Sequence, residues 1–175
     1  MPWVVDTCLV IDVLDADPEY GAISADLLDG TSTEGLLLCP VSFIELAPAF
    51  GGELKRQEHF LRQINVDYTQ DWTWVDTCAA FTGWHRYITL KRSGEVSRRP
   101  VADLLIGAFS MRFDGLLTRN AGDFARLFPE PQLFTKRQIC TWRNALKWEP
   151  SVKPALEMSL IPSREPFTRL PTFPH

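Results

Sequence analysis

The sequence has few of the residues that bind zinc or form disulfide frameworks. Its 175 residues include only three histidines, none at a catalytic spacing from an acid or nucleophile, and four cysteines. The cysteines are far apart and form no Cys-x-x-Cys pair: Cys8, Cys39, Cys78 and Cys140. Zinc sites and secreted disulfide frameworks need closer and more regular spacing. We therefore expect reduced thiols in a core rather than disulfides or zinc ligands.

Long apolar runs are also missing. No stretch of about 18 uninterrupted apolar residues occurs, which is the length that spans a membrane. The N-terminus lacks the basic segment followed by an apolar segment that is typical of a signal peptide. We therefore expect no membrane segment and a cytoplasmic location. With 45% hydrophobic residues, the chain can bury the core of one domain.

The formal net charge of −4 conceals an uneven distribution. Residues 1–90 contain 14 Asp and Glu against 4 Lys and Arg, whereas residues 91–175 contain 8 against 14. The acidic total argues against a surface made for non-specific nucleic-acid binding. A local basic surface that contacts phosphates and an ordinary solvated surface both stay open for the second half.

Short apolar runs alternate with helical patterns over the first 135 residues. Strands are predicted at 3–6 (WVVD), 35–39 (GLLLC), 72–75, 115–120 (GLLTRN) and 132–134 (QLF). Helices are predicted within 9–30, at 41–52 with Ser42 as N-cap, at 53–65, 76–91, 100–113 with Pro100 at or near its first position, and 121–128. This alternation predicts an α/β fold with a central, mainly parallel sheet.

Residues 136–175 have a different character, with many prolines and no strand–helix alternation. We predict a helix over 136–148 followed by an extended, proline-rich tail. The chain therefore divides into a domain at 1–135 and an appendage at 136–175. Aromatic and basic residues alternate in the appendage, which suits either packing or dimer contact, or an arm that contacts RNA.

Acidic residues stand where the predicted strands end. Asp6 ends the first strand, Glu45 follows the second, Asp103 opens a helix that leads into the fourth, and Asp123 follows the fourth. In open parallel sheets, sites form beyond the carboxyl ends of the strands, where the strand order reverses. Converging carboxylates require a cation among them, and Mg²⁺ and Mn²⁺ prefer such oxygen ligands. Metal-assisted attack of water on a phosphodiester is the chemistry that this arrangement favours.

Simpler roles stay open for individual acids. Asp6 is also placed to cap the next helix, and Asp103 to interact with a helix dipole. Glu45 lies within FIELAPAF, where an unpaired carboxylate facing the core would be costly. An ordinary solvent-exposed position without a function is an equally good interpretation of Asp123. Asp12, two turns after Asp6, is expected to be solvated or a supporting neighbour.

Three segments resemble, in order and spacing, the motif blocks of PIN-domain proteins, and most closely those of VapC-type toxins. They are VVDTCLVIDVL (4–14), LCPVSFIEL (38–46) and RRPVADLLIGAFSMRFDGLLTRNAGDFARLFP (98–129). The likeness covers residues 3–135. It implies a three-layer α/β/α PIN-like domain and a Mg²⁺- or Mn²⁺-dependent ribonuclease. It also implies a homodimer and a cognate antitoxin that blocks the acidic groove.

The resemblance also implies roles for single residues. Asp6, Glu45 and Asp103 match the metal-binding acids, and Asp123 is assigned the fourth role, with Asn120 as a weaker ligand or water holder. Hydroxyl groups that hold the acids or bound waters match Thr7 and Thr118. Cys8 departs from the asparagine that usually follows Asp-Thr in the family. The candidates for phosphate contacts are Arg119, Arg98 and Arg99.

The leading hypothesis is a toxin endoribonuclease of a VapBC-like pair that cleaves RNA with a metal-activated water. The alternative is a PIN-fold module that does not cleave and binds RNA or protein, which Cys8 and Asn120 keep open. A phosphatase or phosphotransferase with Asp6 as nucleophile is disfavoured, because Cys8 stands where that class needs a second acid.

Overall fold

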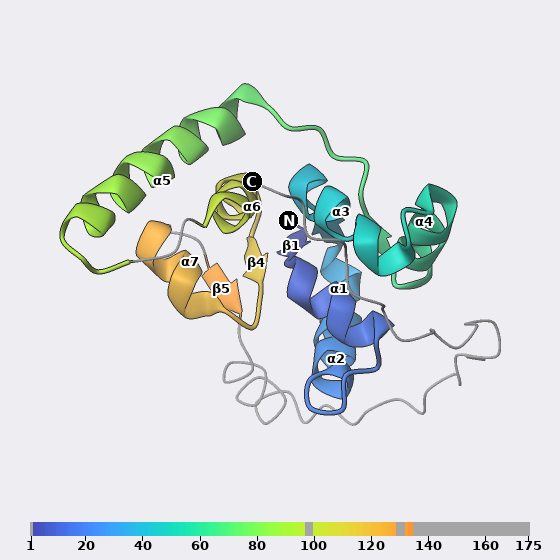
Figure 1. The fold of residues 1–175 in the computed structure, drawn as a ribbon. Helices are drawn as coiled ribbons and strands as arrows, with labels where there is room; N and C mark the ends of the chain where they lie inside the picture. The colour runs from blue at the N-terminus through green and yellow to red at the C-terminus, as the bar shows by residue number, and fades with distance from the viewer. Residues whose placement is uncertain (1, 97–99, 129–131, 135–175) are drawn as a thin grey trace, which may run out of the picture.

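The central sheet is parallel throughout. The computed structural model describes residues 2–96, 100–128 and 132–134, and within these ranges five strands lie in the order β3-β2-β1-β4-β5 (Figure 1). Their bounds are β1 Trp3–Val5, β2 Leu36–Leu38, β3 Val66–Asp67, β4 Gly115–Leu117 and β5 Gln132–Phe134. Every neighbouring pair is parallel. The chain moves outward from β1 first to one side and then to the other, so the strand order reverses at β1.

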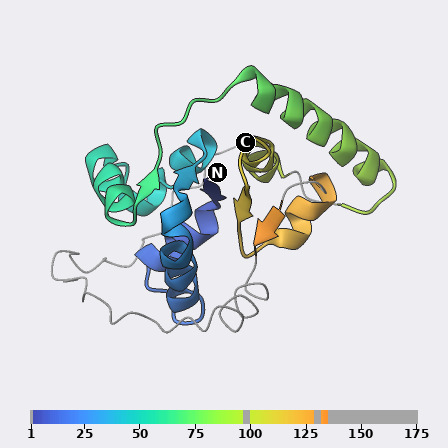
Figure 2. The ribbon, with the colours of Figure 1, turned by 180° about the vertical axis from the view of Figure 1, so that it is seen from behind.

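Helices cover both faces of this sheet, which confirms the expected three-layer α/β/α architecture (Figures 1 and 2). One layer contains α1 (Thr7–Leu14), α2 (Gly21–Thr31) and α4 (Leu54–Gln63). The other contains α5 (Trp74–Arg92), α6 (Val101–Ser110) and α7 (Ala121–Leu127). The remaining elements are η1 (Ser32–Glu34), α3 (Pro40–Glu45) and η2 (Ala47–Phe50).

The alternation of side chains along the buried strands divides the core in two. In β1, Trp3 and Val5 pack with α1, α2 and α4, whereas Val4 packs with α6 and α7 on the opposite face. All three residues are buried, as expected for a strand covered on both faces. A third apolar cluster joins α5 to α6 and α7.

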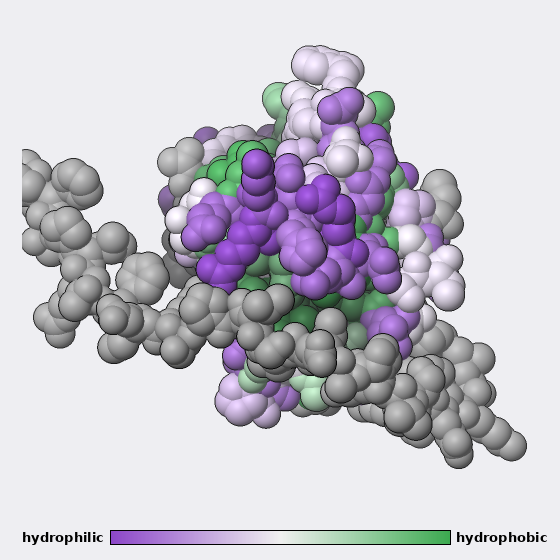
Figure 3. Space-filling model, turned by 90° about the vertical axis from the view of Figure 1, so that its right-hand side faces the viewer, coloured by the Kyte–Doolittle hydropathy of each residue, from purple (hydrophilic) through white to green (hydrophobic). Residues whose placement is uncertain are grey.

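The outer face of α4 is polar. Gln57 and Leu61 are its buried residues, while Lys55, Arg56 and Arg62 are exposed. Figure 3 shows the side of the molecule where α4 lies in Figure 1, and hydrophilic residues gather across much of it. This helix therefore follows the amphipathic pattern that its sequence predicts.

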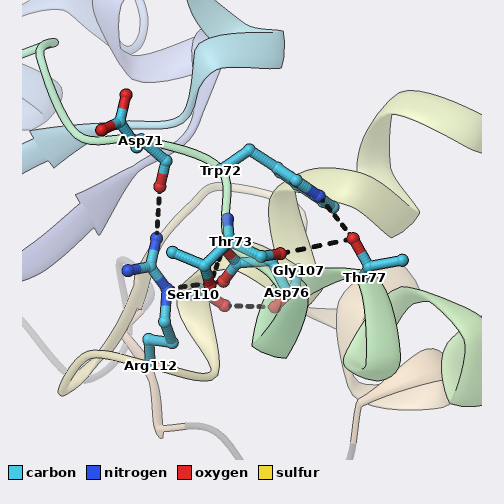
Figure 4. A network of polar contacts seen from close by, with 8 residues as sticks. All are labelled: Asp71, Trp72, Thr73, Asp76, Thr77, Gly107, Ser110 and Arg112. Atoms are coloured by element: carbon cyan, nitrogen blue, oxygen red, sulfur yellow. Dashed lines mark hydrogen bonds and ion pairs between the residues drawn. The ribbon is translucent and has the colours of Figure 1, made fainter.

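A network of polar contacts ties the start of α5 to the end of α6 (Figure 4). Asp76 is fully buried and accepts hydrogen bonds from the backbone and hydroxyl of Thr73, at 2.6 and 2.8 Å. Arg112, two residues beyond α6, pairs with Asp76 at 2.6 Å and donates to the carbonyl of Asp71 at 2.8 Å. Its guanidinium also lies 5.0 Å from the ring centroids of Phe109 and of Phe113. The helix that carries Asp103 is therefore anchored at its far end.

Two sequence predictions about elements are corrected. The strand expected at 72–75 is absent, because Thr73 caps α5, which begins at Trp74, and the third strand is instead Val66–Asp67. Ser42 is no N-cap, since α3 begins at Pro40 with Cys39 in the capping position. Pro100 occupies the N-cap position of α6, directly before its first residue, which agrees with the predicted place at or near the first position.

The remaining predictions concern the thiols, membrane segments and the residues that the structure does not describe. The described cysteines, Cys8, Cys39 and Cys78, are free thiols, but Cys78 is exposed, so the expectation of a core position is wrong for it. No helix in the described part of the chain has the length and apolar character to cross a membrane. Cys140 and the whole predicted appendage, residues 136–175, lie outside the described residues.

Candidate functional site

An open pocket lies where the parallel strands end. Its volume is about 710 Å³. Its lining comes from α1, the α1–α2 turn, the end of α3, the start of α6 and the segment after β4: Asp6, Thr7, Cys8, Ile11, Tyr20, Glu45, Asp103, Arg119 and Asn120. Because β1 is the strand at which the order reverses, this is the edge where α/β proteins bind ligands. Three of the four predicted acids, Asp6, Glu45 and Asp103, meet in it.

Asp6 is the most deeply placed of these acids, with 7% of its surface exposed. It occupies the N-cap position of α1, yet its side chain makes no capping hydrogen bond. Its Oδ2 instead accepts hydrogen bonds from Thr118 Oγ1 at 2.6 Å and from Cys8 Sγ at 3.2 Å. These contacts exclude the simple capping role and hold the carboxylate against the pocket wall. Thr118, for which the resemblance implies a supporting role, is one of the two partners of Asp6.

Cys8 supports Asp6 as a neutral thiol. Burial, and secondly the negative charge of Asp6, raise the pKa of Cys8 to about 12. A protonated thiol is a weak donor, and it donates here to the same oxygen that Thr118 holds. The cysteine that departs from the family pattern therefore keeps a contact with Asp6.

Glu45 reaches the pocket from the end of α3. It is the last residue of this helix and is exposed, so its carboxylate avoids the costly position facing the core. Thr7 Oγ1 donates a hydrogen bond to its Oε2 at 2.9 Å. Thr7, the first residue of α1, thus links Glu45, which follows β2, to its own neighbour Asp6, which follows β1.

Asp103 lies in the first turn of α6 and is half-buried at the pocket wall. Asp123 is not brought into the pocket. It is exposed in the first turn of α7 and accepts a hydrogen bond from Asn120 Nδ2 at 2.7 Å. Asn120 itself lines the pocket, and its backbone N–H donates to Thr118 Oγ1 at 2.9 Å. Of the two candidates for the fourth position, Asn120 lies at the pocket and Asp123 lies behind it.

Arg119 also lines the pocket, as predicted for a residue that contacts RNA, whereas Arg98 and Arg99 lie outside the described residues. Arg119 has two neighbours at the site: Asp12, for which the sequence left a solvated or a supporting place open, and Tyr20, which the sequence did not assign. Asp12 is 3% exposed and pairs with Arg119, and Tyr20 stacks against its guanidinium. Asp12 stands between Ile11 and Val13 on an apolar helix, which is the signal that a buried carboxylate would give.

The donor set suits a hard divalent cation without forming a finished cage. Across residues 2–96, 100–128 and 132–134, no three His, Cys, Asp or Glu side chains are grouped closely enough to enclose an ion. Mg²⁺, however, keeps several waters and is usually held by one or two carboxylates. One carboxylate oxygen of Asp6 and one of Glu45 accept a hydrogen bond from a threonine hydroxyl. No described residue donates a hydrogen bond to the second oxygen of either carboxylate. The pocket therefore fits a largely hydrated Mg²⁺ or Mn²⁺ and does not fit zinc.

Comparisons with known proteins agree with the fold. The fold is similar to that of a VapBC2 chain. That chain belongs to the crystal structure of VapBC2 from Rickettsia felis bound to a DNA fragment from their promoter. The TM-score is 0.54 at 17% sequence identity, and the match covers 77% of this chain and 98% of that chain. No family model matches the sequence, and no curated protein matches it.

Proposed function

We propose that this chain is a Mg²⁺- or Mn²⁺-dependent endoribonuclease, the toxin component of a VapBC-like toxin–antitoxin pair. The observation that carries the proposal is the meeting of Asp6, Glu45 and Asp103 in one pocket at the carboxyl edge of a parallel sheet. The likeness of the fold to a VapBC2 chain and the resemblance of the three sequence segments to VapC-type motifs support it.

The acids of the pocket and their polar neighbours would have different roles in such a reaction. Asp6, Glu45 and Asp103 would hold the cation, with Asn120 at the edge of the pocket as a neutral ligand or water holder. A divalent cation held there lowers the pKa of water and offsets the charge that develops on the phosphodiester. Thr118 and Thr7 fix the two carboxylates that they contact, so little reorganisation is needed when RNA binds.

A second candidate function is a PIN-like module that binds RNA or protein without cleaving. The position of Asp123 outside the pocket and the absence of a closed cage among the described residues favour it. Calorimetric titration with Mn²⁺ separates the two functions. Heat from binding that disappears in Asp6→Asn supports the nuclease, and a silent titration of folded protein supports the binding module.

The proposal includes two protein partners. An antitoxin would cover the acidic pocket, as the resemblance of the three sequence segments to those of VapC-type toxins implies. A second copy of the chain would pack on α5, where Trp74 and Phe81 are each 77% exposed and Val75 is 61% exposed. Exposed large apolar side chains gathered on one helix are typical of a protein interface.

The decisive experiment is an RNA cleavage assay with purified protein. Total RNA is incubated with and without Mg²⁺, and the wild type is compared with Asp6→Asn and Asp103→Asn. Because each substitution removes a charged ligand and keeps the side-chain shape, we expect cleavage to fall at least about 100-fold. Cleavage by either variant at the wild-type rate would overturn the assignment of metal ligands.

A matched control separates the loss of a ligand from the loss of a charge. Asp29→Asn removes an exposed acid on α2 that does not line the pocket. We expect it to cleave RNA at the wild-type rate. Circular dichroism of all three variants checks that the α/β fold is retained.

A further inference from the structure

Asp12 is a buried carboxylate outside the set of proposed metal ligands. It is 3% exposed within α1, and both of its oxygens have partners. Ser24 Oγ of α2 donates to Oδ2 at 2.7 Å, and Arg119 Nη1 lies 2.9 Å from Oδ1. A buried charge that loses its partner is strongly destabilising. The Asp12 carboxylate therefore fixes the position of Arg119.

Arg119 is fixed a second time by an aromatic ring. Its guanidinium carbon lies 4.5 Å from the centroid of the Tyr20 ring, a distance typical of stacking between arginine and an aromatic side chain. The guanidinium thus has one edge on a carboxylate and one face on a ring. Even so, 38% of the side chain stays exposed, and both Arg119 and Tyr20 line the pocket.

The turn that presents Tyr20 is itself tightly built. Asp17 Oδ1 accepts hydrogen bonds from the backbone N–H groups of Tyr20 at 2.8 Å and Glu19 at 2.9 Å, and these bonds hold the pKa of Asp17 below its usual value. A Cβ on Gly21 would come within 3.1 Å of the carbonyl oxygen of Asp12 and of the carbonyl carbon of Ala16. The turn therefore packs directly onto the helix that carries Asp12. Tyr20 is held in place before any ligand binds.

We propose that Tyr20 and Arg119, positioned by Asp12, form a stacking subsite for one base of a single-stranded RNA. This inference rests on the proposed ribonuclease function and names the subsite that would hold the nucleotide beside the acids. Unpaired bases of single-stranded RNA stack on aromatic rings and on guanidinium planes. The exposed part of Arg119, stacked on the Tyr20 ring, borders the pocket that Asp6, Glu45 and Asp103 line.

A base fits this subsite better than a phosphate does. The charge of Arg119 is already compensated by Asp12, and the other ionised groups of the pocket lining are acids. A phosphate would meet little net positive charge there, whereas stacking needs only an open planar surface. Asp12 is therefore a positioning residue, and Tyr20 and Arg119 are the residues that contact the base.

Binding measured without a metal tests the subsite independently of cleavage. A fluorescent single-stranded oligoribonucleotide is titrated in EDTA with the wild-type chain, Tyr20→Ala, Arg119→Ala and Asp12→Asn, and anisotropy gives the affinity. We expect each variant to bind about tenfold more weakly, which is within the range for losing one stacked base. Tyr20→Phe keeps the ring and should recover most of the affinity lost in Tyr20→Ala. Arg62→Ala, on the exposed face of α4, should bind as the wild type does.

Salt dependence and abasic probes distinguish a base contact from a phosphate contact. Loss of a phosphate contact lowers the slope of log K against log salt by about 0.7 for a single strand, whereas loss of stacking leaves the slope unchanged. An abasic position that weakens binding to the wild type should not weaken binding to Arg119→Ala further. A reduced slope in Arg119→Ala, or wild-type affinity in both alanine variants, overturns the subsite alone. Absence of RNA binding by the wild type overturns the subsite, whereas the proposed function is overturned separately by absence of cleavage with Mg²⁺.

Discussion

Thr118 and Thr7 each hold one oxygen of a pocket carboxylate. Thr118 is 1% exposed and donates to Asp6 at 2.6 Å, while Thr7 donates to Glu45 at 2.9 Å. A hydroxyl that orients a metal ligand is typically worth 10–100-fold in metal affinity. We therefore expect Thr118→Val, which keeps the shape and removes the donor, to weaken Mn²⁺ binding by about 10–100-fold. Calorimetry measures the loss, and Thr33→Val, at an exposed position of η1, is the matched control. Unchanged Mn²⁺ affinity in Thr118→Val would contradict the orienting role.

The three described cysteines differ in the reactivity that their surroundings allow. Burial raises the pKa of Cys39 to about 11, and burial with the Asp6 charge raises that of Cys8 to about 12, whereas Cys78 is exposed. A thiol with a raised pKa stays protonated, and the thiolate is the reactive form. In a Cys140→Ser background at pH 8, we expect iodoacetamide to label Cys78 only. Mass spectrometry of the native and the urea-unfolded protein checks this, and rapid native labelling of Cys8 would show that the pocket wall opens.

Some site residues could be found from the sequence because their place at the end of a strand or at the start of a helix determines where they lie. Asp6 and Asp103 stand at the end of a strand and at the start of a helix, so the parallel topology alone brings them to one edge. Asp12 could not be placed in the same way, because its burial depends on Ser24 in α2 and on Arg119 beyond β4. Asp123 lies outside the pocket lining, and no local signal in the sequence separates the first turn of α7 from the pocket.

Two helices approach closely through glycines that face one aromatic ring. A Cβ on Gly107 of α6 would lie 2.5 Å from the ring of Phe128, and a Cβ on Gly83 of α5 would lie 2.6 Å from the same ring. Phe128 is 4% exposed and has little room to move. Its position explains why α5, α6 and α7 form one layer.

Gly107→Ala should therefore destabilise the fold. Overpacking costs about 1–3 kcal/mol, and the better helix propensity of alanine offsets about 1 kcal/mol at most. Gly122→Ala in α7, where a Cβ would meet nothing within 4 Å, gains the propensity without the clash and is the matched control. Urea unfolding should show a lower free energy of unfolding for Gly107→Ala and a higher one for Gly122→Ala. In a Phe128→Leu background, Gly107→Ala should lower the free energy of unfolding by less. Equal stabilities of Gly107→Ala and Gly122→Ala would contradict the close packing.

Most elements could be predicted from the sequence because their periodicity is strong. The runs that became β1, β2 and β4 are apolar and fully buried, and α6 has an apolar face with an acid in its first turn. The strand β3 was missed because only two residues form it, one of them a partly exposed Asp67. The apolar residues Trp72 and Val75 gave the pattern of a strand close to β3. At this place the hydrogen bonds between Thr73 and Asp76 start a helix instead.

The molecule as a whole presents one long helix along its outside. α5 runs over the outer edge of the fold in both ribbon views (Figures 1 and 2). Trp74, Cys78 and Phe81 follow one another at helical spacing, and all three are exposed. A two-fold symmetric contact uses the same surface on both copies, so a stripe along one helix can pair with itself. The proposed homodimer is therefore expected to form along α5.

Placing a charge in that stripe should dissociate the dimer. Large aromatic residues at the centre of an interface contribute about 2 kcal/mol or more each, which corresponds to at least about a 30-fold change in the dissociation constant. We expect Trp74→Glu and Phe81→Glu to be monomers by light scattering at concentrations where the wild type is a dimer. Leu54→Glu on α4, 58% exposed and distant in sequence from the stripe, should stay dimeric. If both α5 variants remain dimeric and deletion of residues 150–175 yields a monomer, the appendage rather than α5 forms the dimer contact.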